Sequence, residues 1–535
     1  MSKRVNNIIH SLHVKAKKKS WESAYQLYEY YRDGKYIEKD YNAASSYMEL
    51  AIQHINSDFL SIEEIAFSDF RGFSDIVLKL PKENLLLIAG ENGVGKSSIL
   101  DGISYSLSWL VNRILYKGGK GKEFDRLDIK YDSEKGYSSI LMKLAINKNA
   151  RALFELCEVH LGGTANKKSY LTEFSKLGAL YKFAGEKDSN FTMPLFAYYG
   201  ISRTIDISTK DINMIDEYDI SKNDSRFEAY INSFSGKADI KSFLKWFKRL
   251  DDIEKHRMTS SEVVSEDEDL INKLSILAPS DINARNLLET LLEKKVKNDN
   301  ENSLFEIKKI KETLNHAIFV CMDGYSNLEI EIEPVVKLTI TKKNHKLNIL
   351  QLSQGEKSLL SLVLDIARRM LILNPNENFP LHSPGIIVID EIDLHLHPQW
   401  QRSIVESLYE VFRNCQFIVS THSPQVISEV KHKQIFILTE NANGAINTYN
   451  PKQSYGLTSN EILNELMSAD KKQLIRSYSV ECKLDEIFDL IEQGNISLAK
   501  DEISALESQV NGDIPELLSA KMEIELQEWD ENDKD

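Results

Sequence analysis

The stretch LLLIAGENGVGKSSIL, residues 85–100, decides the fold of this 535-residue chain. Four consecutive apolar residues, 85–88, predict a buried strand, and a helical pattern begins at residue 98. The spacing G-x-x-x-x-G-K-S lies between them, and its glycines let backbone N–H groups curl around phosphate oxygens. This order of strand, glycine-rich loop and helix predicts a binding site for a polyphosphate at the helix N-terminus.

The residues of this loop have expected roles in binding ATP and Mg²⁺. Lys96 is expected to reach the β and γ phosphates and to act in catalysis, and the Ser97 hydroxyl is expected to ligate Mg²⁺. The residues expected to contact the nucleotide are Gly90, Glu91, Asn92, Gly93, Val94, Gly95, Lys96, Ser97 and Ser98. The alternative, a glycine-rich turn without function, leaves the flanking strand and helix unexplained.

Length and composition indicate an ordinary soluble protein of two to four domains, with 42% hydrophobic and 27% charged residues. No apolar run approaches about 18 residues, and the N-terminus has no apolar core, so neither a membrane span nor a secretory signal is expected. The four cysteines lie far apart without a CxxC pair, which suits a reducing cytoplasm. We therefore expect a cytoplasmic protein without membrane association.

The charge balance limits how the chain could bind nucleic acid. It has 66 basic and 81 acidic residues, a net charge of −15, so such binding would need a local basic patch. One candidate is residues 3–19, and the other is the segment YKGGKGK with Lys117, Lys120 and Lys122. Solvated surface lysines are the alternative interpretation of each.

The pattern of the chain predicts five parts. Small and aromatic residues alternate at helical spacing over 20–56, with a break at Asp33 and Gly34, which predicts an antiparallel helical pair. The predicted parts are 1–57, a basic arm and this hairpin; 58–204, the first half of an ATPase head; 205–325, an inserted helical lobe with an acid-rich patch at 262–269; 326–450, the second half of the head; and 451–535, a helical end.

A second anion site is predicted at LSQGEK, residues 352–357, which precedes a long apolar helix. Ser353 and Gly355 would lie at the helix N-terminus, where the helix dipole favours an anion. The motif resembles the signature of ABC-type ATPases. That resemblance implies that Ser353, Gly355 and Glu356 cover the γ-phosphate bound by the opposite subunit, so that two nucleotides lie between two chains.

Two further strands end in polar residues that suit hydrolysis. GIIVIDEID, residues 385–393, predicts a buried strand that places Asp390 beside Mg²⁺ and Glu391 as the general base. In QFIVSTHSP, residues 416–424, His422 matches the switch histidine that senses the γ-phosphate. His395 and His397 suggest a metal site, but no third ligand is at a useful spacing, so packing or a dimer contact is favoured.

Two assignments are less specific. The phrase FSDFRGFSDI resembles the opening strands of SMC- and RecF-like ATPases, which implies that Arg71 lies near the nucleotide. No clear glutamine loop is visible between the phosphate loop and the signature. Tyr198, Tyr199 and Arg203 occupy roughly its place, and the sequence leaves open which of them contacts nucleotide or metal.

The whole motif set resembles the ABC-type ATPases of the OLD and RecF group, and more closely the PtuA family of Septu-type antiphage defence. The hairpin, similar to a Sel-type TPR-like repeat, and the ending YGLTSNEIL resemble its retron-associated branch. This resemblance implies an α/β fold, with an ABC-type P-loop ATPase head that carries an inserted helical lobe, an N-terminal hairpin and a C-terminal helical tail.

The same resemblance implies a homodimer or higher even oligomer and a separate HNH nuclease subunit, PtuB-like, in a toxin–antitoxin-like effector. In the retron setting it also implies a reverse transcriptase with its RNA–DNA product. Only about 110 residues follow His422, and the one DxD among them, at 533–535, does not follow a strand-like run, so no nuclease activity is expected in this chain. The alternatives are a RecF- or OLD-like repair ATPase that binds DNA directly, and a scaffold that holds nucleotide without turnover.

Overall fold

The computed structural model describes residues 3–57, 59–131, 133, 135–159, 167–203, 225–255, 300–331, 337–441, 444–463, 466, 478–510 and 514–532. Residues 205–224 and 256–299 of the predicted inserted lobe, with its acid-rich patch, lie outside the described residues. The chain forms two compact units, Met1–Leu457 and Thr458–Asp535, and each is described by itself. The predicted five-part division remains a prediction.

Three helices begin the first unit: α1 (Lys3–Lys17), α2 (Trp21–Asp33) and α3 (Tyr41–Ile55). The residues predicted as a basic arm therefore form a helix, and the predicted pair corresponds to α2 and α3. Tyr31 stacks on Tyr47 with ring centroids 5.6 Å apart, which joins these two helices. The indole Nε1 of Trp21 donates to the Arg151 carbonyl at 2.9 Å, so α2 docks on the strands that follow.

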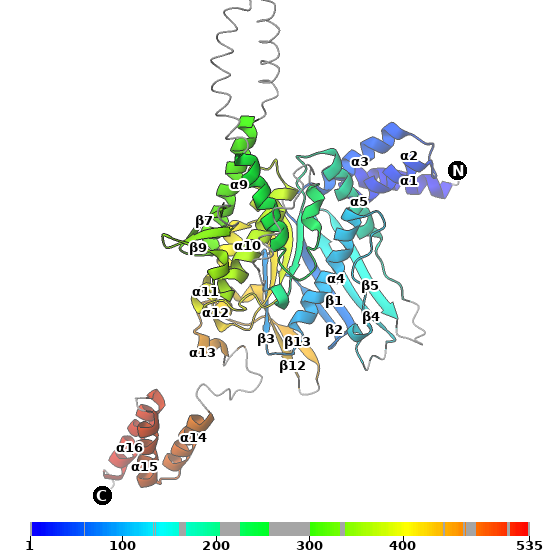
Figure 1. Cartoon of the computed structure of the whole chain (residues 1–535). Helices are drawn as coiled ribbons and strands as arrows, with labels where there is room; N and C mark the ends of the chain where they lie inside the picture. The colour runs from blue at the N-terminus through cyan, green and yellow to red at the C-terminus, as the bar shows by residue number, and fades with distance from the viewer. Residues whose placement is uncertain are drawn as a thin grey trace, which may run out of the picture. The chain divides into compact units, whose positions relative to one another are not determined.

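A four-stranded antiparallel sheet comes next, in the order β2-β1-β4-β5 (Figure 1). Its strands are β1 (Ser61–Phe70), β2 (Phe73–Lys79), β4 (Tyr137–Ala145) and β5 (Arg151–Val159). Inward-facing residues such as Phe67 and Phe154 are buried, as the period-two pattern of an antiparallel strand requires. The helix α5 (Thr172–Lys187) packs on β5 and on the helix that follows the phosphate loop.

A six-stranded sheet in the order β13-β12-β3-β11-β10-β6 carries the predicted nucleotide site. Its strands are β3 (Leu85–Gly90), β6 (Leu195–Tyr199), β10 (Gly385–Ile389), β11 (Cys415–Ser420), β12 (Ile435–Glu440) and β13 (Ile446–Tyr449). All neighbours pair in parallel except β13, and β3, β6, β10 and β11 are buried throughout. Parallel strands buried on both faces read as continuous apolar runs, which is why the sequence revealed them.

Helices cover this second sheet, and the α/β fold that the sequence predicted is confirmed (Figure 1). The helix α4 (Lys96–Leu115) contacts strands of both sheets, and α10 (Gln354–Leu373) contacts β6. A smaller antiparallel sheet lies beside α9 (Asn300–Cys321). The strands of this sheet are β7 (Tyr325–Glu331), β8 (Lys337–Lys342) and β9 (His345–Asn348). Residues 240–255 are helical, as predicted.

The second unit contains α14 (Tyr478–Glu492), α15 (Ile496–Val510) and α16 (Pro515–Asn532), which pack around a small apolar core. Residues 458–535 contain 20 acidic and 7 basic residues, so this unit carries 13 of the 15 net negative charges. The rest of the chain is close to neutral. Among the described helices, we find none with both the length and the apolar character that a membrane crossing requires.

Candidate functional site

The phosphate loop joins β3 to α4 through glycines that no other residue could replace without strain. Gly90, Gly93 and Gly95 have φ values of 144°, 83° and 101°. A Cβ on Gly90 would lie 2.5 Å from the Leu438 carbonyl oxygen, and one on Gly95 would lie 2.8 Å from the Phe73 ring. Left-handed backbone and close neighbours both require glycine here, and the loop is left open for phosphate oxygens.

The side chain of Lys96 lies folded over this loop. It is 5% exposed, and its ammonium donates to the carbonyls of Gly90 at 2.9 Å and Glu91 at 2.7 Å. Burial lowers its pKa to about 8, although the nearby carboxylates of Glu391 and Asp390 oppose this shift. An ammonium bound to backbone carbonyls can exchange them for phosphate oxygens. Ser97 and Ser98 are half-buried in the first turn of α4.

The predicted magnesium ligand lies at the same edge of the sheet. Because β3, β11 and β10 are adjacent and parallel, their carboxyl ends meet beside the phosphate loop. Asp390 follows β10 and is 2% exposed, and its backbone N–H donates to the Tyr199 carbonyl at 2.8 Å. The Ser420 hydroxyl donates to Asp390 and accepts from the Glu391 N–H at 2.7 Å, so one serine fixes both acids.

The His422 imidazole lies between Lys96 of the phosphate loop and Glu391, the predicted general base. Its Nδ1 is 3.4 Å from the Lys96 ammonium, and its Nε2 is 3.7 Å from Glu391 Oε1. Burial and then the charge of Lys96 lower its pKa, against the opposing effect of Glu391. The imidazole is therefore neutral near pH 7, and it joins the phosphate loop to the proposed general base.

The signature residues line a different cavity, of about 710 Å³, that none of residues 90–98 lines. Ser353 caps α10, and Glu356 completes the capping box by accepting from the Ser353 N–H at 2.6 Å. Burial opposes ionisation of Glu356, but hydrogen bonds from Lys342, Tyr325 and Ser353 outweigh it and lower the pKa to about 2. The Glu356 carboxylate thus holds the helix N-terminus in place.

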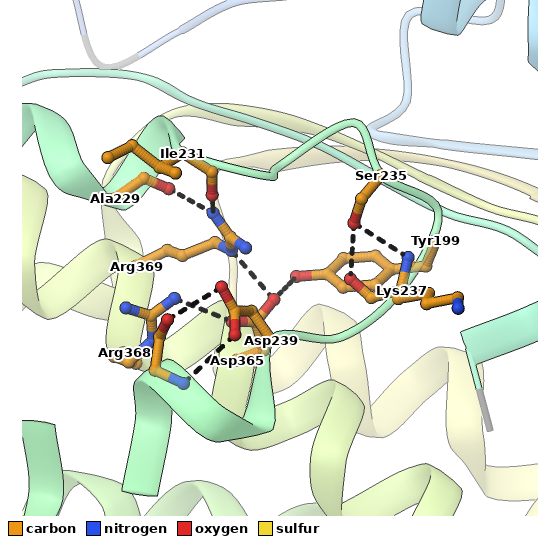
Figure 2. A network of polar contacts seen from close by, with 10 residues as sticks. Tyr199, Ala229, Ile231, Ser235, Lys237, Asp239, Asp365, Arg368 and Arg369 are labelled. Atoms are coloured by element: carbon orange, nitrogen blue, oxygen red, sulfur yellow. Dashed lines mark hydrogen bonds and ion pairs between the residues drawn. The ribbon is translucent and has the colours of Figure 1, made fainter. Parts of the chain in front are cut away.

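The structure separates the two tyrosines that the sequence left open. The Tyr199 hydroxyl donates to the buried Asp365 at 2.9 Å, inside a network with Arg368 and Arg369 of α10 (Figure 2). The Tyr198 hydroxyl donates instead to Asp101 at 2.8 Å, one turn of α4 after Ser97. Tyr198 is therefore the one beside the phosphate loop; the Arg203 side chain lies outside the described residues.

Arg71 lies in the same polar cluster, but two carboxylates hold it. Its guanidinium donates to Asp101 at 2.7 Å and to Asp128 at 2.8 Å. Burial would lower its pKa, yet these two hydrogen bonds outweigh burial and raise it. Its predicted contact with the nucleotide remains a prediction.

The two histidines after Glu391, His395 and His397, make capping and packing contacts. His397 accepts from the Gln399 N–H as the N-cap of α11 (Pro398–Val411), and the His395 carbonyl lies against Gly355. In the described part of the chain, no group of three His, Cys, Asp or Glu side chains is placed to hold a metal ion.

Sequence reasoning missed several polar residues that support the site. Thr421 donates to Asp393, which follows the predicted acids by two residues, and Asp101 joins Tyr198 to Arg71. Asp393 stands inside the motif GIIVIDEID and could have been found there. Asp101 carries no motif signal, because its role depends on packing between distant segments.

These features together fit ATP with Mg²⁺: a glycine cradle, a displaceable ammonium and a buried carboxylate at the end of a neighbouring parallel strand. The fold and the site define a P-loop ATPase of the ABC type. A family model described as "AAA domain, putative AbiEii toxin, Type IV TA system" matches residues 204–428.

Known proteins resemble this chain over most of its length. It is 31% identical to the "Retron Ec83 probable ATPase" of Escherichia coli, covering 99% of each chain. It is 33% identical to the "Retron Vc95 probable ATPase" of Vibrio cholerae serotype O1 biovar El Tor, covering 79% of this chain and 82% of the relative. The "Septu protein PtuA" of Bacillus mycoides (strain KBAB4) is 24% identical, over 71% of this chain and 40% of that protein.

The chain belongs to the family of retron ATPases, and is an ATPase of antiphage defence. Among solved structures, it is similar to the Smc head domain with an extended coiled coil from Pyrococcus furiosus, with 16% identity, a TM-score of 0.41, and coverage of 74% of this chain and 96% of that one. The SMC head domain from Thermotoga maritima gives 14% identity and a TM-score of 0.36, over 73% and 99% of the two chains.

Proposed function

We propose that this ATPase closes into a dimer around ATP and Mg²⁺ and thereby controls a separate nuclease. Lys96, Ser97 and Asp390 bind ATP and Mg²⁺, Glu391 orients the attacking water, and His422 senses the γ-phosphate. The observation that carries this proposal is the position of His422, 3.4 Å from Lys96 and 3.7 Å from Glu391. A group in contact with both can respond to phosphate between them.

The separation of the signature residues from the phosphate loop within one subunit supports dimerisation. Ser353 and Gly355 line the cavity that includes Lys342, His395 and Trp400, apart from the phosphate loop. A helix N-terminus with no phosphate of its own subunit to bind can cover the nucleotide of a second copy. Contacts that exist only with ATP bound would bias the assembly between a closed and an open state.

Membership of the retron ATPase family supports a proposal about partners. We propose that the chain works with an HNH nuclease subunit, PtuB-like, and with a retron reverse transcriptase and its RNA–DNA product. Its relatives named as retron ATPases and as Septu PtuA support this assignment to the retron-associated PtuA branch. The helices α2 and α3 would then be the Sel-type TPR-like repeat of that branch.

The test measures ATP hydrolysis and molecular mass together. Lys96→Ala is expected to lose ATP binding, hydrolysis and ATP-dependent dimerisation. Glu391→Gln is expected to lose hydrolysis but to accumulate the ATP-bound dimer, seen by light scattering with ATP and Mg²⁺. Wild-type hydrolysis rates in both variants would reject these roles. If the wild-type ATPase remains a monomer by light scattering with ATP, Mg²⁺ and the co-expressed nuclease, the dimer is rejected.

The same preparation tests the repair-ATPase alternative. Tight binding of plain duplex DNA by the isolated protein, falling steeply between 50 and 200 mM salt, would favour direct DNA recognition. We expect weak binding, because the chain carries a net charge of −15, and residues 1–457 alone carry no net positive charge.

A further inference from the structure

The glycine-rich segment after α4 is firmly attached to that helix. The Trp109 indole donates to the Lys122 carbonyl at 2.9 Å, and the Asn112 amide donates to the Lys120 carbonyl at 2.8 Å. The Lys122 N–H in turn donates to the Ser108 hydroxyl at 2.8 Å. These bonds tie Lys120 to Asn112 and Lys122 to the turn with Ser108 and Trp109, so this part of the segment runs back along α4, toward its N-terminal end.

Glycine makes this close approach possible. A Cβ on Gly121 would lie 2.5 Å from the backbone nitrogen of Trp109 and would overlap its indole ring. A side chain at this position would therefore push the segment away from α4. The close packing of YKGGKGK on α4 therefore fixes the position of its last lysine, Lys122.

Lys122 lies beside the polar cluster that contains Tyr198 and Asp101. Its ammonium lies 5.9 Å from the ring centroid of Tyr105 and 5.7 Å from that of Tyr198. Tyr198 is bonded to Asp101, one helical turn after Ser97. Both lysines are exposed, but Lys120 differs because its ammonium is paired with Glu123 at 3.3 Å.

The charge of Lys122 remains available in this cluster. Arg71 is bound by both Asp101 and Asp128. In the described residues, by contrast, the contacts of the Lys122 ammonium are two aromatic faces, and we find no carboxylate within ion-pair distance of it. Loss of hydration lowers the pKa of Lys122, with Asp101 opposing. An accessible ammonium over aromatic rings can still bind an anion.

We propose that Lys122 is a nucleotide-binding residue, a second ammonium that binds phosphate oxygens of the ATP held by Lys96. This inference rests on the proposed nucleotide site and adds a residue from outside every motif. The segment that follows α4 then supplies a positioned cation. Lys122 lies over Tyr198 of β6, the strand that pairs with β10, and Tyr198 in turn donates to Asp101.

The experiment measures binding of a fluorescent ATP analogue, mant-ATP, to the full-length protein with Mg²⁺. Lys122→Met keeps the apolar stem over the rings and removes the charge. It should weaken binding by roughly 10- to 100-fold, the range for a lost hydrogen bond to a charged group. Lys122→Arg should stay within about 3-fold of wild type, and Lys120→Met, the matched control, should be unchanged. Gly121→Ala should act like Lys122→Met, because it displaces the segment.

The controls separate the possible failures. Wild-type affinity in Lys122→Met, with binding abolished in Lys96→Ala, would overturn the role of Lys122 and leave the nucleotide site intact. Wild-type affinity in Lys96→Ala as well would overturn the site itself. Thermal unfolding of each variant identifies a folding defect. If Lys122→Met unfolds, Lys122→Gln takes its place, and equal weakening in Lys122→Arg and Lys122→Gln would show a packing role and reject the proposal.

Discussion

The imidazole Nε2 of His422 lies 3.7 Å from the carboxylate Oε1 of Glu391. The distance is longer than a hydrogen bond, so the two side chains are neighbours that a small shift or a bound water could join. The other ring nitrogen is 3.4 Å from Lys96. Three elements distant in sequence thus meet at one ring, and this arrangement leads to the first prediction.

Replacing His422 by Ala should slow ATP hydrolysis by roughly 100-fold, the usual effect of removing one polar contact to the reacting phosphate. Binding of ATP should change little, because Lys96 and the loop backbone remain. Steady-state phosphate release and mant-ATP titration measure the two effects. His432→Ala is the control, since that histidine lies in a short turn before β12. Equal losses of binding and hydrolysis in His422→Ala would contradict a sensor role.

Binding of ATP should depend on pH through Lys96. In the empty site burial lowers its pKa to about 8, so the ammonium is lost as the pH rises above 8. A bound triphosphate favours the charged form and raises this pKa. Binding at pH 8 should therefore take up protons, and affinity should fall by up to about tenfold per pH unit above pH 8.

Titration calorimetry at pH 8 in two buffers of different ionisation enthalpy measures this proton uptake. A matched titration at pH 6.5 should show little uptake by Lys96, because its ammonium is already formed. The same observed enthalpy in both buffers at pH 8 would show that Lys96 is fully charged before ATP binds.

The signature helix should be sensitive to one methyl group. A Cβ on Gly355 would overlap the His395 carbonyl oxygen, so Gly355→Ala should shift the start of α10 away from the segment after Glu391. We expect ATP hydrolysis to fall at least tenfold while a single subunit still binds mant-ATP. Gly456→Ala controls for the strain of alanine in left-handed backbone without a clash, because Gly456 has a φ of 81° and a Cβ there would meet no atom within 4 Å. Hydrolysis at the wild-type rate in Gly355→Ala would rule out this close packing.

The buried network of α10 should contribute strongly to stability. Asp365 and Arg369 are both fully buried and 2.9 Å apart, and Arg369 also donates to the carbonyls of Ala229 and Ile231 (Figure 2). Arg369→Met leaves Asp365 with a weaker set of partners, which should cost about 3–5 kcal/mol in the free energy of unfolding.

Urea unfolding of the full chain measures that cost. Arg151→Met is the matched control, because its pair with Glu63 is largely exposed and should contribute less than about 1 kcal/mol. Similar unfolding midpoints for the two variants would show that the buried network is not a major source of stability.

Local patterns were enough to predict the α/β fold and the groups at the strand ends. The runs before Gly90 and Asp390 are apolar throughout because parallel strands are buried on both faces, and each ends in polar residues at the same sheet edge. By contrast, the helical state of residues 3–17 was missed, since its lysines mask a weak apolar face that packs on α2.

The sequence by itself determined the phosphate loop, its neighbouring acids and the family, because those signals lie within a few consecutive residues. Only the tertiary structure decided that Tyr198 and not Tyr199 lies beside the phosphate loop, that Arg71 is held by Asp101 and Asp128, and that Lys122 joins them. The physical reason is that these contacts form between segments far apart in the chain. Packing and desolvation, which no local pattern encodes, decide which polar groups meet.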